Sequence, residues 1–91
     1  MRFEWDRAKD ATNRTKHGVS FAEAMRVFGD PLAISIDDRD HSAGEARLLT
    51  SGRSAGGRLL IVAHTDRDGR LRIINAREVT RREREQYESG N

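Results

Sequence analysis

Both lysines of this 91-residue chain lie in one short segment, residues 5–18, which reads WDRAKDATNRTKHG. The other 15 basic residues are all arginine. On a helix of about 100° per residue, Lys9, Asn13 and Lys16 fall on one stripe. Lysine is a flexible point charge, which suits a mobile phosphate backbone or an acidic protein segment. We therefore expect this stripe to bind an anionic partner, although its methylene stems could instead simply cover the edge of the core.

Arginines form a second candidate group, in the basic half of the sequence. Residues 47–77 contain seven arginines and two aspartates, whereas residues 30–46 contain five acidic residues and one arginine. A guanidinium can bind phosphate through two parallel hydrogen bonds, and a strand holds it stiffly. Arg47 and Arg77 are the expected phosphate clamps, and Arg58 is expected to bind substrate between them. Structural ion pairs are the alternative for each arginine.

Four further side chains are candidates for proton transfer or stacking. Glu45 and Arg47 are expected on one face of one strand, which would place a carboxylate base beside a guanidinium; a surface ion pair is the alternative. His17 is a candidate because an imidazole can act as acid or base, but a histidine in the last turn of a helix also stabilises that helix end. Tyr87 could stack on a base or anchor the last helix. His64 is expected to be a hydrogen-bonded, partly buried imidazole rather than a catalyst.

The composition limits the class of protein. With 35% hydrophobic residues, 35% charged residues and a net charge of +2, the chain is expected to form a single small domain over residues 1–91. No stretch approaches the ~20 apolar residues of a membrane span, and the N-terminus lacks an apolar signal-peptide core. Without cysteine, disulfides and thiolate zinc sites are excluded. We expect a cytoplasmic protein with no metal and no cofactor.

The lysine segment should be the first helix, after a short edge strand at residues 2–5. Asp6 can cap this helix at its start, and Gly18 after His17 can end it in the left-handed conformation. The buried side of the helix is expected to consist of Ala8, Ala11, Thr12 and Thr15. The lysine stripe would then lie beside the buried side.

Two further helices are predicted by capping-box patterns. Ser20 and Glu23 open a short second helix, which the sequence Gly-Asp-Pro at residues 29–31 ends. Thr80 and Glu83 open a final helix that runs to about Tyr87. This last helix has almost no apolar face, so it must dock through a few residues or be completed by a partner.

Four strands are expected between the second and the last helix, at residues 32–37, 45–52, 58–65 and 70–77. The turns between the last three are short, which favours an antiparallel meander. Leu32, Ile34 and Ile36 alternate with small or polar residues, so the first of these strands is expected to have one buried face.

The resulting fold class is α+β, with helices on one face of an antiparallel sheet and the other face partly open. In the last strand, Arg72 and Arg77 are five residues apart. A regular strand would place them on opposite faces. Arg72 is therefore the weaker candidate for a shared phosphate site.

Three segments together resemble the BrnT family of bacterial toxins. They read FEWDRAKDATNRTKHGVSFAEAMRVFGDP, EARLLTSGRSAGGRLLIVAHT and RIINAREVTRRERE, with a tyrosine two residues after the last. The likeness spans residues 3–87, and the combination W-D-x-x-K-x-x-x-N-x-x-K-H-G-V with a later I-I-x-A-R is specific. It implies a RelE-like fold: a short N-terminal strand, two helices, a four-stranded antiparallel meander and a C-terminal helix.

The resemblance also implies an activity and a partner. These are RNA cleavage that arrests translation in a type II toxin–antitoxin system, and neutralisation by a BrnA-type antitoxin with a ribbon-helix-helix DNA-binding domain. Metal-independent cleavage needs a proton acceptor, cations at the phosphoryl group and a proton donor. The expected catalytic residues are Glu45, Arg47, Arg77, His17 and Tyr87, and the expected substrate-binding residues are Lys9, Asn13, Lys16 and Arg58. A non-catalytic module that binds nucleic acid or antitoxin through the same basic face is the alternative.

Overall fold

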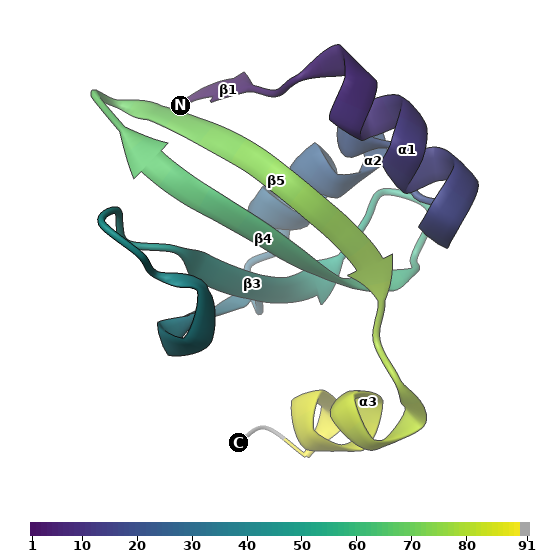
Figure 1. The fold of residues 1–91 in the computed structure, drawn as a ribbon. Coiled ribbons are helices and arrows are strands. Elements are labelled where there is room, and N and C mark those ends of the chain that lie inside the picture. Colours follow the sequence, from purple (N-terminus) through teal and green to yellow (C-terminus); the bar gives the residue numbers. More distant parts are fainter. Residues whose placement is uncertain (90–91) are drawn as a thin grey trace.

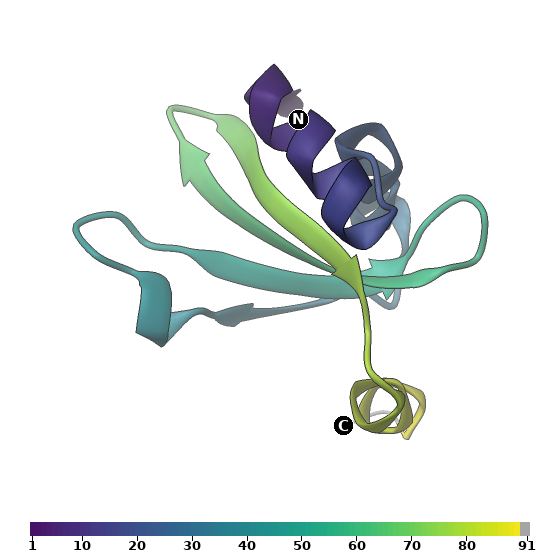
Figure 2. The same ribbon diagram turned by 45° about the vertical axis from the view of Figure 1, so that its right-hand side comes forward.

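The computed structural model describes residues 1–89, which form a five-stranded mixed sheet with helices on both faces (Figures 1 and 2). One face is covered by α1 (Arg7–His17), α2 (Phe21–Met25) and the 3₁₀ turn η1 (Arg26–Gly29), and α3 (Arg81–Glu88) lies on the other. The strands are β1 (Arg2–Glu4), β2 (Ile34–Asp37), β3 (Leu48–Arg53), β4 (Leu59–Arg67) and β5 (Arg70–Glu78). The predicted α+β class is confirmed. No helix in this part of the chain is long and apolar enough to span a membrane.

The first helix begins and ends at the predicted residues. The Asp6 carboxylate accepts a hydrogen bond from the Ala8 N–H at 2.8 Å, which caps the start of α1. Gly18 follows α1 with a φ of 69°, and its N–H donates to the Arg14 carbonyl at 2.9 Å. The helix after Ser20 is shorter than predicted, because α2 tightens into η1 after one and a half turns.

The sheet has the order β1-β5-β4-β3-β2. Strands β2 to β5 form the predicted antiparallel meander, and β1 adds to the edge of β5 in parallel. Asp68 and Gly69 form the β4–β5 turn with φ angles of 52° and 76°, the left-handed pair that a two-residue hairpin turn prefers. In the order of the sheet, β4 is the central strand, as its unbroken apolar sequence indicates.

The core lies between this sheet and the α1/α2 layer. It consists of Val19, Phe21, Ala24, Val27, Leu60, Val62, Leu71, Ile73 and Ala76. None of these residues comes from α1, whose single buried residue is Asn13. The predicted buried side of α1 is therefore wrong, since its alanines and threonines are exposed. The reason is that α2 and η1 occupy the centre of the sheet, so α1 packs over β5 at the side (Figure 2).

A β-bulge interrupts the β4–β5 pairing, and the sequence did not indicate it. Ala63 pairs with Asn75 but His64 pairs with Ile73, so Ile74 is an extra residue on β5. The bulge shifts the alternation by one residue. Arg72 and Arg77 therefore lie on the same face, away from the core, and the prediction that they point in opposite directions is wrong.

The apolar side of β2 is exposed, contrary to the prediction of a buried face. Leu32 is 71% exposed, Ile34 40% and Ile36 58%. Ile34 and Ile36 lie on the α3 side of the sheet, because Ile34 pairs with Ser51 and Ser51 with Ile61, which faces away from the core. The short α3 covers only part of that face.

Candidate functional site

Glu45 and Arg47 do not form the predicted pair. β3 begins at Leu48, so both residues lie in the loop before the strand. The Glu45 carboxylate accepts two hydrogen bonds from Arg67, at 2.8 and 2.9 Å, and these bonds lower the pKa of Glu45. Arg47 instead has its Nε 3.3 Å from the Asp38 carboxylate. A carboxylate base beside a guanidinium clamp is therefore absent at this position.

Arg47 and Arg77 do not converge on one pocket either. Arg77 pairs across the sheet with Ile61, which pairs with Ser51. Arg47 lies four residues before Ser51, a distance of roughly 13 Å along the strand. The pocket that Arg77 lines does not include Arg47. Arg47 lies in the loop before β3 and Arg77 in β5, and no pocket joins them, so the predicted two-arginine phosphate site is wrong.

Arg77 is bound by a carboxylate of α3. Its Nη1 and Nη2 donate to the two oxygens of Glu83 at 2.8 and 3.0 Å, and these bonds lower the pKa of Glu83 to about 2. Tyr87, also on α3, donates its O–H to Asp30 at 2.9 Å. A pocket of about 320 Å³ lies between α3 and the sheet, and four of its lining residues are Ile34, Ile36, Leu49 and Ile61. We name these four residues the apolar patch; with one neutralised arginine beside it, the pocket is poorly suited to phosphate.

Arg58 has a structural role. Its guanidinium binds the Glu23 carboxylate through two nitrogens, Glu78 at 2.8 Å and the Gly18 carbonyl at 2.9 Å. The hydrogen bond with Glu23 is the main reason why the pKa of Arg58 is raised. Arg58 thus links the end of α1 to α2, β4 and β5. Its guanidinium N–H groups are already bonded within the protein, so they are not available to bind a phosphate.

Asn13 is also structural. Its side chain is 4% exposed, and its amide nitrogen donates to the carbonyls of Val19 and Ala76, each at 2.8 Å. Its amide oxygen accepts from the Ala76 N–H at 3.1 Å. β1 pairs only with residues 70–72 of β5, so the outer edge of β5 is open at Ala76. Asn13 satisfies both backbone groups there, as a neighbouring strand would.

The remaining predicted residues meet in one place. A pocket of about 290 Å³ lies between α1 and the bulged part of β5; its lining residues are Ala8, Lys9, Thr12, Asn13, Lys16, His17, Ile74 and Asn75. We name it the lysine pocket. Within residues 1–89, neither lysine has an ion-pair partner. The nearby acid of α1, Asp10, instead accepts from the Phe21 N–H at 2.9 Å.

The lysine pocket differs in charge from the other sites. Arg47, Arg58 and Arg77 each lie against a carboxylate, whereas Lys9 and Lys16 keep their charge available for an external anion. No acidic residue lines the pocket. His17 supplies a group that can exchange a proton at the pocket, and Asn75 lies at its β5 side.

Asn75 is a site residue that the sequence analysis missed. It lines the lysine pocket next to the bulge residue Ile74. One signal was available: asparagine is depleted in strands, and here it follows two isoleucines in a strand sequence.

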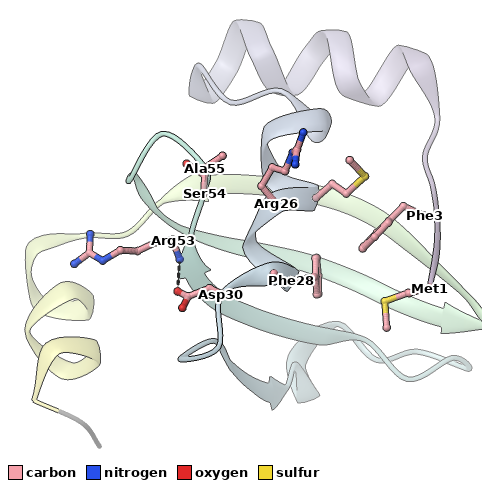
Figure 3. Close-up of a pocket in the computed structure, with 10 residues that line it drawn as sticks. Met1, Phe3, Arg26, Phe28, Asp30, Arg53, Ser54 and Ala55 are labelled. Atoms are coloured by element: carbon pink, nitrogen blue, oxygen red, sulfur yellow. Dashed lines mark hydrogen bonds between the residues drawn. The ribbon is translucent and has the colours of Figure 1, made fainter.

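The largest of these three pockets has little catalytic potential (Figure 3). It measures about 760 Å³ and is lined mainly by apolar side chains, among them Phe3, Met25 and Phe28. Figure 3 shows Asp30 at one end, bonded to the backbone of Arg53, whose side chain points away from the pocket. The Asp30 carboxylate accepts from the N–H groups of Arg53 and Leu32 at 2.8 and 2.9 Å, and these bonds lower its pKa. This carboxylate is therefore a structural cap.

His64 has the structural role predicted for it. It is 3% exposed, its Nε2 is 2.7 Å from the Thr50 hydroxyl, and its Nδ1 is 3.3 Å from the Asp66 carboxylate. Burial lowers the pKa of His64. In the described part of the chain, no group of three or more His, Cys, Asp or Glu side chains could hold a metal ion.

Comparisons with known proteins agree with this fold. A family model described as the ribonuclease toxin BrnT of type II toxin–antitoxin systems matches residues 5–83. The crystal structure of the Brucella abortus ribonuclease toxin BrnT matches with a TM-score of 0.69 and 24% identity, over 89% of this chain and 99% of that chain. A search of curated proteins found no match. Because the family model covers most of its length, this chain belongs to the BrnT family of ribonuclease toxins of type II toxin–antitoxin systems.

Proposed function

We propose that this toxin cleaves RNA without a metal ion, and that it does so in the lysine pocket. The observation that carries the proposal is the charge state of the pocket. Lys9 and Lys16 lie beside His17 with no carboxylate to neutralise them, while the other candidate cations are held in ion pairs. An RNA phosphate entering this pocket gains two cationic contacts and displaces no internal ion pair.

The residues of the pocket suit a transesterification. His17 takes the proton of the 2′-hydroxyl as its oxygen attacks phosphorus, and the bond from phosphorus to the 5′-oxygen breaks. Lys9 and Lys16 stabilise the negative charge that builds on the phosphoryl oxygens. The leaving 5′-oxygen takes a proton from the Lys16 ammonium or from water at the open side of the pocket. General base catalysis of this kind contributes typically 10²–10⁴-fold to the rate.

Loss of messenger RNA in the cytoplasm would arrest translation, which is the toxic outcome we propose. A protein antitoxin must hold the toxin inactive, and we propose a BrnA-type protein with a ribbon-helix-helix domain. The family assignment supports a protein antitoxin of some kind, because the system is of type II.

The test is cleavage of a single-stranded RNA in the presence of EDTA. Wild type is expected to cut the RNA and to leave an all-2′-deoxy copy intact, because the attacking hydroxyl is missing. His17→Gln should lower the cleavage rate constant about 100-fold or more while RNA binding is retained. Arg14→Gln, on the solvent side of the same helix, is the matched control and should cut at the wild-type rate.

Two results would contradict the proposal. Cleavage that depends on a divalent ion and stops in EDTA would rule out the metal-independent mechanism. Binding of RNA with a steep salt dependence but without cleavage would favour the non-catalytic module instead.

A further inference from the structure

We propose that the antitoxin anchors on the free edge of β2 and on the apolar patch beside it, by adding an extended segment to the sheet. The inference rests on the proposed function only for the existence of a protein antitoxin. It does not depend on where RNA is cleaved, and it assigns the binding surface to the opposite side of the sheet from the lysine pocket.

The outer edge of β2 has backbone groups ready for a partner strand. β2 is the last strand of the sheet and pairs only with β3. The Asp38 N–H donates to the Arg47 carbonyl at 2.8 Å, so alternation directs the backbone groups of Ile34 and Ile36 toward β3. The N–H and C=O groups of Ser35 and Asp37 therefore point outward, where an added strand would bond to them.

The side chains of β2, and that of Leu32 in the turn before it, provide apolar contact area at the same place. Leu32, Ile34 and Ile36 are three of the four large hydrophobic residues that the described chain exposes. Edge strands of soluble proteins are normally protected by charge, by proline or by a covering element. Here the exposed isoleucines continue into the pocket lined by Leu49 and Ile61, which can accept one or two apolar side chains of a bound segment.

The far wall of this pocket is a weakly held helix. α3 has no buried residue, and its contacts to the rest of the protein include the Arg77–Glu83 pair, the Tyr87–Asp30 hydrogen bond and the Arg53–Glu88 pair. A helix held by such polar contacts can shift by a small amount to admit a partner. The pocket therefore has one rigid wall, the sheet, and one adaptable wall.

Charge indicates a protein partner rather than RNA or a second copy of the toxin. Residues 30–46, which include β2, carry five acidic residues and one arginine, but Asp38 is paired with Arg47 and Glu45 with Arg67. Asp37 and Asp40 have no ion-pair partner within residues 1–89. An unpaired aspartate on the outer edge of β2 favours a basic protein segment over an RNA phosphate. Two toxin molecules that paired through β2 would bring both acidic segments together, so the partner segment should alternate apolar residues with Lys or Arg.

The experiment measures binding of the toxin to the product of the adjacent reading frame, purified separately. Ile36→Lys places a charge in the apolar patch, and Asp37→Pro removes an outward N–H without touching the β2–β3 bonds. Each is expected to raise Kd roughly 30-fold or more. The matched controls Ile36→Val and Asp37→Ala should stay within about 3-fold and 10-fold of wild type. Arg26→Glu, at the rim of the largest pocket, should bind like wild type.

Two further readouts separate this proposal from the ribonuclease proposal. Circular dichroism and thermal unfolding establish that each variant is folded. Ile36→Lys should cut RNA at the wild-type rate, whereas His17→Gln should bind the partner with the wild-type Kd. If wild type fails to cut RNA at all, the binding results still decide the docking surface.

Four outcomes would overturn the inference. These are unchanged binding by both Ile36→Lys and Asp37→Pro, loss of binding by Arg26→Glu alone, failure of the adjacent product to bind wild type, and a dimer of wild-type toxin that Ile36→Lys dissociates. The second outcome would place the docking site at the largest pocket. The last would show that β2 pairs with a second copy.

Discussion

At the scale of single residues, Asn13 shows how one polar side chain decides the position of a helix. Its amide forms three hydrogen bonds, two of them to the backbone of Ala76 and one to Val19. These bonds fix α1 over the open part of β5. They also set the distance between the lysines of α1 and Asn75 of β5, so a buried residue defines the width of the candidate site.

Asn13→Ala is expected to destabilise the protein by roughly 2–4 kcal/mol, because it leaves a buried N–H and two carbonyls without partners. The free energy of unfolding in urea measures the loss. Thr12→Ala, an exposed neighbour on the same helix, should stay within about 0.5 kcal/mol of wild type. A similarly small effect for Asn13→Ala would show that water replaces the amide and that α1 is fixed by other contacts.

The sequence predicted residue roles well where the partner is local. Asp6, Gly18 and Thr80 cap their helices as expected, and each bonds a group two to four residues away. The predicted roles were wrong where the bonding partner is distant in the sequence. Arg58 binds Glu23 across 35 residues of sequence, and Arg72 binds Glu4 across 68. The order of charges along the sequence does not show which guanidinium a carboxylate will neutralise. Arginines that are paired in the structure were therefore predicted to be available for phosphate.

At the scale of elements, α3 is the part of the fold with the fewest constraints. Its capping box forms as predicted, with Thr80 and Glu83 each bonding the backbone of the other. The same Glu83 also binds Arg77, so one carboxylate both starts the helix and docks it. The near absence of an apolar face, visible in the sequence, correctly indicated a helix that adds little to the core.

Tyr87→Phe is expected to loosen α3 selectively. It removes the hydrogen bond to Asp30, worth about 1 kcal/mol, and leaves the aromatic ring in place. Amide hydrogen exchange should quicken about 5-fold across residues 81–88 while the amides of β4 and β5 keep their protection. Equal protection of α3 in both proteins would mean that the two ion pairs, rather than Tyr87, dock the helix.

Strand periodicity predicted the meander but could not reveal the bulge. Ile73 and Ile74 are adjacent and both apolar, so either could have been the inward residue. Only the pairing with β4 locates the bulge, because His64 pairs with Ile73 and Ala63 pairs with Asn75. This one irregularity places Arg72 and Arg77 on the same side of the sheet, contrary to the prediction from regular alternation. The residues that α1 contributes to the candidate site were therefore predicted from the sequence, whereas those that β5 contributes were not.

At the scale of the whole molecule, the two proposed functions lie on opposite edges of one sheet. The lysine pocket adjoins β5 and the docking edge is β2, three strand spacings or roughly 15 Å away. Lys9 and Lys16 lie beside one edge, whereas the unpaired Asp37 lies on the other. Cleavage and antitoxin binding should therefore be lost through separate sets of substitutions.

Stability of the whole fold is expected to fall as the pH drops below about 6.5. Burial lowers the pKa of His64 in the folded protein, so the unfolded chain takes up this proton first. The stabilisation is complete above the unfolded pKa and is lost progressively as the pH falls below it. Urea unfolding at pH 7.5, 6.5 and 5.5 measures the slope, which should flatten in His64→Gln. An equal slope in that variant would assign the acid sensitivity to another group.

The central claim is that the free lysines, rather than the paired Arg77, form the site of RNA cleavage. The most direct test compares single-turnover cleavage rate constants in EDTA for the double variant Lys9→Gln/Lys16→Gln and for Arg77→Gln. We expect a loss of about 100-fold or more for the lysine variant and a change within about 3-fold for Arg77→Gln. The reverse pattern, with the lysine variant near wild type and Arg77→Gln inactive while folded, would contradict it and move the chemistry to the α3 side of the sheet.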